Sequence, residues 1–147
     1  MNSSYELVRK FMKKYPLTVA WRLRKHAKII DRHLNPGEKI LYVFAGQKND
    51  TSLDLVNTNI VALTDKRIMV ATKRVFFGYF FMTITPDMFN DLTVKKGIIF
   101  GDVVIDTIKE QVVLSNIDPK GLPEIETVIT EYMMHEKKKY PPRDEKK

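Results

Sequence analysis

The sequence predicts a mainly β domain, a small barrel or sandwich of about seven antiparallel strands with two helices before it and one after it. Short β-prone runs bounded by turn residues recur at regular spacing through residues 38–114. At both ends of the chain, apolar residues recur every three or four positions, as in amphipathic helices. The 147 residues, 44% of them hydrophobic, suffice for one domain with a real core.

Residues 1–33 are predicted to form a basic helical extension. Ser3 and Glu6 have the spacing of a capping box, and residues 3–15 present one apolar face. A second helix is expected over 17–33, because Pro16 suits a first helical position and Leu23, Ala27 and Ile30 recur along one side.

The predicted domain occupies residues 34–135. Its central hairpin, 59–71, is two apolar runs joined by Thr64-Asp65-Lys66-Arg67, where Thr and Asp side chains favour a turn by bonding nearby backbone N–H groups. The other strands are expected over 40–45, 75–82, 91–95, 98–105 and 111–114. A helix over 123–134 closes the domain, and residues 136–147 form a charged tail expected to be disordered.

The positive charge lies outside the predicted barrel. Residues 1–33 carry nine Lys/Arg against two Asp/Glu, residues 34–134 ten against thirteen, and residues 135–147 six against three. This distribution weakens a nucleic-acid interpretation of the pI of about 9.5. Zero cysteines exclude disulfides and thiolate sites, no apolar run is long enough to cross a membrane, and a cytoplasmic location is expected.

Several strings, in this order, resemble the bacterial pleckstrin-homology (PH) domain family: LNPGEKI at 34–40, IVALTDKRI at 60–68, and NDLTVKKG at 90–97 followed by GDVVI at 101–105. The resemblance implies a seven-stranded, strongly bent antiparallel barrel of two near-orthogonal sheets, plugged by the C-terminal helix. It also implies a non-catalytic interaction module that self-associates and binds a protein partner. Asn57 and Asn59 depart from the family pattern, in which a glycine is expected nearby, and the N-terminal helices are additional to it.

No catalytic, cofactor or metal site is predicted. His26 and His33 lie seven residues apart on the second predicted helix without a third ligand nearby, and are expected to be solvated. There is no nucleophile-elbow serine and no glycine-rich phosphate loop. The loop 46–57 holds Lys48 but also Asp50 and Asp54, so the phosphoinositide site of eukaryotic PH domains is not expected here.

Three groups of residues are candidate interaction surfaces. The first is a partner or membrane surface on the N-terminal helices: Phe11, Trp21, Arg22, Lys25, Lys28 and Arg32. The second is an anion-facing cluster around the central hairpin: Lys66, Arg67, Lys73 and Arg74. The third is an aromatic run expected to be covered by a helix or by another subunit: Phe76, Phe77, Tyr79, Phe80 and Phe81.

Alternatives remain open for the first two groups. The apolar side of the helices 5–33 can pack on the barrel or on a sister chain, their basic side can lie on an anionic membrane, and nucleic acid is a further possible partner. The hairpin cations either hold an anion or keep strand ends soluble.

Overall fold

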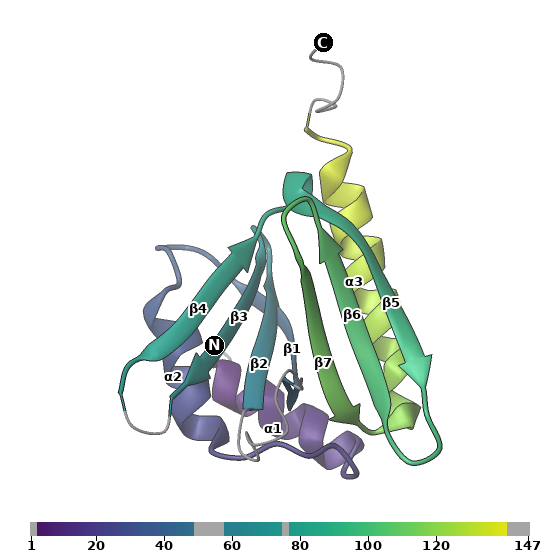
Figure 1. Cartoon of the computed structure of the whole chain (residues 1–147). Coiled ribbons are helices and arrows are strands. Elements are labelled where there is room, and N and C mark those ends of the chain that lie inside the picture. Colours follow the sequence, from purple (N-terminus) through teal and green to yellow (C-terminus); the bar gives the residue numbers. More distant parts are fainter. Residues whose placement is uncertain (1–2, 49–57, 75–76, 141–147) are drawn as a thin grey trace.

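Seven strands form one antiparallel sheet in the order β4-β3-β2-β1-β7-β6-β5. The computed structural model describes residues 3–48, 58–74 and 77–140. The strands are β1 Ile40–Gln47, β2 Thr58–Thr64, β3 Ile68–Lys73, β4 Tyr79–Ile84, β5 Phe89–Lys96, β6 Gly101–Thr107 and β7 Gln111–Ile117. Among described residues β1 and β7 pair only at Gln47 and Ser115, so the sheet splits into two diverging halves with β4 and β5 as open edges (Figure 1).

The C-terminal helix α3, Leu122–Lys137, closes the space between the two halves of the sheet. Its Ile125, Ile129 and Met133 are fully buried in one cluster with Phe44 of β1 and Leu114 of β7. Each such side chain contributes roughly 1.5–3 kcal/mol when buried. The predicted seven-stranded bent sheet with a closing helix is therefore confirmed.

Both N-terminal helices pack into the same fold. Helix α1, Ser4–Lys14, begins with the predicted capping box, in which Ser3 and Glu6 bond each other's backbone N–H groups. It lies along β1, and its Val8 and Phe11 enter two different core clusters. Helix α2, Leu23–Arg32, covers the outer side of β2 and β3 with Ala27, Ile29 and Ile30.

A carboxylate fixes α1 against α3 and β1. Glu124 accepts hydrogen bonds from the hydroxyls of Tyr15 at 2.7 Å and Tyr42 at 2.9 Å, and pairs with the Lys14 ammonium at 2.6 Å. Partial burial alone would raise the pKa of Glu124, but these donors hold it below its usual value. The N-terminal helices are thereby joined to the closing helix by polar as well as apolar contacts.

Several element boundaries differ from the sequence prediction. Strand β4 spans Tyr79–Ile84 instead of 75–82, of which residues 75 and 76 lie outside the described residues. Helix α3 continues to Lys137, into the predicted tail. The starts of α2 and β6 are also shifted. Helix α2 begins at Leu23 instead of residue 17, because the preceding segment is hydrogen-bonded to the sheet: Val19 N–H donates to Asn116 O at 2.9 Å, and Trp21 N–H to Thr58 Oγ1 at 2.9 Å. Strand β6 begins at Gly101 instead of residue 98, because residues 97–100 form a tight turn closed by Gly97 N–H and Phe100 O at 2.8 Å.

Within the described residues, no helix combines the length and apolar character needed to cross a membrane.

Candidate interaction surface

The turn at 64–67 is an internal hub. Thr64 Oγ1 accepts from the N–H groups of Lys66 and Arg67, as its residue type predicts, and donates to Glu38 Oε2 at 2.6 Å. The Arg67 guanidinium bonds both oxygens of Glu38 at 3.0 Å and the carbonyl of His33 at 2.8 Å. The Arg67 guanidinium therefore makes its hydrogen bonds within the fold and is not available to a ligand.

Glu38 is the buried anion of this hub. Burial alone would raise the pKa of its carboxyl group, but the donors from Arg67, Asn35 N–H and Thr64 outweigh burial and lower the pKa to about 2. Glu38 is therefore ionised at neutral pH and balances the Arg67 charge.

The predicted cluster of four cations is separated into two sites. Lys66 and Arg67 lie at the start of β3, whereas Lys73 and Arg74 lie at its end. Six residues of extended strand place these two pairs roughly 20 Å apart. The structure instead brings Lys73 and Arg74 to the beginning of α2.

Contacts between α2 and the β3–β4 hairpin assemble a new surface. Arg22 Nη1 donates to Lys73 O at 3.2 Å, and Lys73 Nζ reaches Gly78 O at 3.4 Å. Arg22 adopts the left-handed conformation at φ 53°, unusual for a residue with a side chain. We call the resulting surface the basic–aromatic face: Trp21, Arg22, Lys25, Lys28, Lys73, Arg74 and Phe77.

Aromatic side chains are exposed within this face. Trp21 is 51% exposed and Phe77 is 86% exposed. Tyr79 is also exposed, but its ring lies 5.7 Å from that of His33, at the other end of α2. Lys25, Lys28 and Arg74 are exposed as well. Asp31, the acidic residue of α2, lies on the side toward α1, where its carboxylate accepts from Ser4 N–H at 3.2 Å. The face therefore combines cations and exposed aromatic rings.

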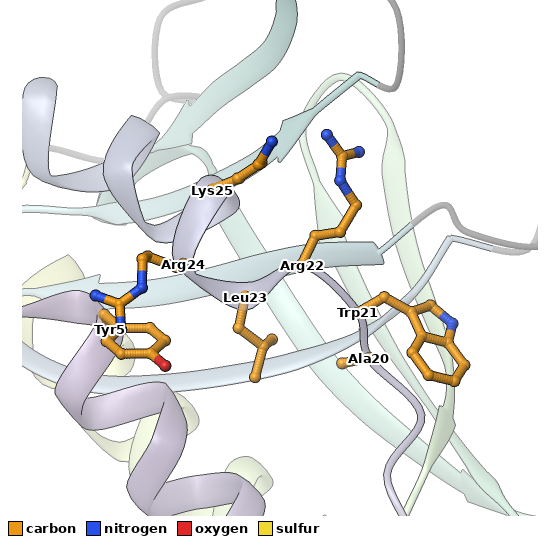
Figure 2. A pocket seen from close by; sticks show the side chains of 7 residues that line it. All are labelled: Tyr5, Ala20, Trp21, Arg22, Leu23, Arg24 and Lys25. Carbon is orange, nitrogen blue, oxygen red and sulfur yellow. The ribbon is translucent and has the colours of Figure 1, made fainter.

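A shallow pocket of about 440 Å³ borders the face at the start of α2. Figure 2 shows Leu23 between Trp21 on one side and Tyr5 with Arg24 on the other, while Arg22 and Lys25 extend away from Leu23. The Arg24 guanidinium lies 4.2 Å from the centre of the Tyr5 ring, a cation–π contact. The pocket walls are apolar and aromatic, and their rim is cationic.

His26 connects α2 to the end of β3, under the basic–aromatic face. It is fully buried, contrary to the prediction of a solvated side chain, and its Nδ1 accepts from Lys73 N–H at 2.7 Å. Burial, with a contribution from Arg22, lowers its pKa to about 4. A neutral His26 therefore holds the end of β3 under α2.

The remaining predicted surface residues are distributed differently. Phe11 is buried, with its ring centre 6.4 Å from that of Tyr42 and 6.1 Å from that of Phe44 on β1. It therefore belongs to the core and not to a partner surface. Phe81 is half-buried, and its ring stacks on that of His33, the C-cap of α2, with ring centres 3.8 Å apart. Phe80 packs toward the inner core, and Arg32 is exposed on α2. Phe76 lies outside the described residues.

Sequence reasoning expected a helix or another subunit over the aromatic run, but it did not identify the contacts of Arg22 and His26 with Lys73. The two segments are about fifty residues apart, and no local pattern joins them. The structure also places no group of three or more metal-ligating side chains within the parts of the chain that it describes.

A bent open sheet closed by a C-terminal helix defines a PH-like domain. A family model described as bacterial PH domain matches residues 34–131, and the chain belongs to that family. No curated protein matches the sequence.

Similar solved structures include two from Shewanella species. One is a pleckstrin homology domain from Shewanella amazonensis SB2B, 12% identical, covering 86% of this chain and 98% of that one with a TM-score of 0.46. The other is a protein from Shewanella loihica PV-4 with a pleckstrin-homology domain, 10% identical, covering 76% of this chain and 89% of that one with a TM-score of 0.47.

Proposed function

We propose that this protein is a non-catalytic interaction module that docks on an anionic membrane surface, at the cytoplasmic side, through its basic–aromatic face. The observation that supports this most is that the Arg22–Lys73 hydrogen bond joins two segments which each carry cations and an exposed aromatic ring, Trp21 before α2 and Phe77 before β4. Tryptophan favours the polar–apolar boundary of a bilayer, and Lys and Arg favour anionic headgroups.

The cations and the aromatic rings of the face contribute to binding in different ways. Lys25, Lys28 and Arg74 are exposed and supply long-range attraction, each worth about 1 kcal/mol near an anionic surface. The aromatic rings add burial of apolar surface at the interface. Because the attraction is electrostatic, binding weakens with added salt.

Vesicle sedimentation tests this proposal. The variant K25Q/K28Q/R74Q should bind phosphatidylcholine–phosphatidylserine vesicles roughly a hundredfold more weakly than the unaltered chain. A matched control, K39Q/K66Q/K109Q, removes three exposed cations near turns at the opposite end of the strands and should bind normally. Equal loss in both variants, or no binding by the unaltered chain at low salt, would contradict the proposal.

Self-association and binding of a protein partner form the second candidate function. Among the described residues, β4 and β5 each pair with a strand on one side only, and an open edge is a template for pairing with another chain. Light scattering over a range of concentrations tests it, and a monomer at all concentrations would argue against self-association. A salt-sensitive gel shift without vesicle binding would favour nucleic acid instead.

A further inference from the structure

The tip of the β5–β6 hairpin carries two adjacent exposed isoleucines. Ile98 is fully exposed and Ile99 is 63% exposed, at a position where hairpins usually carry polar turn residues. Gly97 makes the turn possible, since a Cβ there would approach Phe100 O to 2.8 Å. Lys95 and Lys96, both exposed, precede the tip.

Strand register places this tip at the same end of the molecule as the basic–aromatic face. Gly101, the first residue of β6, pairs with Ile117 of β7, and Ser115 of β7 pairs with Gln47 at the end of β1. Gln47 in turn pairs with Thr58, the residue to which Trp21 is hydrogen-bonded. Figure 1 shows the end of β3, the start of β4 and the β5–β6 connection at the same lower end of the sheet.

We propose that Ile98 and Ile99 form a second membrane anchor, which inserts into the apolar layer of an anionic bilayer beneath Lys95 and Lys96. This inference rests on the proposed function, because it takes the same membrane as the ligand. Aliphatic side chains at the end of a rigid hairpin gain free energy by leaving water, and the adjacent lysines match the headgroup charge. Their charge favours an anionic bilayer over an uncharged apolar protein surface.

Two separated anchors would fix the orientation of the domain. The basic–aromatic face engages the membrane through the first half of the sheet, and the isoleucine tip engages it through the second half. With both in contact, the β5–β6 tip faces the bilayer, and the β6–β7 turn with Ile108, at the other end of β6, faces away.

A site-specific fluorophore tests the insertion. The chain has no cysteine, so Ile98→Cys and, as the matched control, Ile108→Cys can each carry a single nitrobenzoxadiazole label. Ile108 is 45% exposed at the β6–β7 turn. On phosphatidylcholine–phosphatidylserine vesicles, the label at 98 should shift to the blue and be quenched by spin-labelled acyl chains, whereas the label at 108 should not change.

Substitution supplies a second readout. I98S/I99S should bind the same vesicles at least about a hundredfold more weakly, with I108S as the control that binds normally. If the unaltered chain binds but the label at 98 stays silent and I98S/I99S binds equally well, the isoleucine anchor is wrong and the basic–aromatic face stands. If the unaltered chain does not bind, both proposals fall.

Discussion

At the scale of single residues, Arg67 shows that a cation beside a turn can have a purely structural role. Its guanidinium neutralises Glu38, whose side chain is 1% exposed, and it also bonds the carbonyl after α2. A buried carboxylate deprived of its partner is costly, because neither water nor another cation replaces the lost contact.

We therefore expect Arg67→Met to lower the free energy of unfolding by roughly 3 kcal/mol. The neighbouring Lys66→Met, which removes an exposed cation, should change it by less than about 0.5 kcal/mol. Urea unfolding measures both variants. Equal effects would show that Arg67 contributes no more to the fold than a surface lysine.

His26 makes the free energy of unfolding depend on pH. Its pKa is about 4 in the folded chain and 6.5 as a free side chain, so between these values the unfolded chain binds a proton that the folded chain excludes. Its contribution to stability is complete above pH 6.5 and is lost as the pH falls through about 4.

His26→Asn, which keeps an acceptor for Lys73 N–H, should lower stability at neutral pH but flatten this dependence. The expected difference in slope approaches 1.4 kcal/mol per pH unit between about pH 4 and pH 6.5. Urea unfolding at several pH values measures it. An unchanged slope in the variant would mean that His26 already titrates normally in the folded chain.

At the scale of elements, α1 behaves as part of the core. The predicted amphipathic face is real, but Phe11 inserts beside Phe44 and Tyr42 instead of facing a partner. A chain starting at residue 34 would therefore expose β1, β2 and β3 and is not a suitable test of the function of the helices.

Phe11→Ala should lower the free energy of unfolding by roughly 3–5 kcal/mol, because it leaves a cavity where α1 meets β1. Lys10→Ala, at an exposed position of the same helix, is the control and should change little. Thermal or urea unfolding compares the two. A small effect of Phe11→Ala would return Phe11 to the list of candidate surface residues.

Sequence patterns correctly predicted those elements that are stabilised by contacts between residues close in the sequence. The Thr64 turn, the Ser3 capping box and the alternation along the strands all rest on neighbours within a few residues. The start of α2 was mispredicted because Val19 and Trp21 find backbone partners in β7 and β2, far away in the sequence. The burial of His26 and the division of the hairpin cations were likewise set by tertiary contacts.

At the scale of the whole molecule, the fold gathers the cations of the N-terminal segment at one end of the sheet. The mildly acidic barrel and the basic N-terminal segment are not separate bodies, because α2 lies on β2 and β3 and brings its cations to the end of β3. That end also carries the exposed Trp21 and Phe77 and, across the sheet, the isoleucine tip. The features on which the proposed membrane docking rests are therefore gathered at one end of the domain.

The most direct test uses the intrinsic fluorescence of Trp21, the single tryptophan of the chain. Titration with phosphatidylcholine–phosphatidylserine vesicles at low salt should shift its emission to the blue, and added salt or vesicles of phosphatidylcholine alone should abolish the shift. An emission spectrum that does not change with anionic vesicles at low salt would contradict membrane docking through the basic–aromatic face.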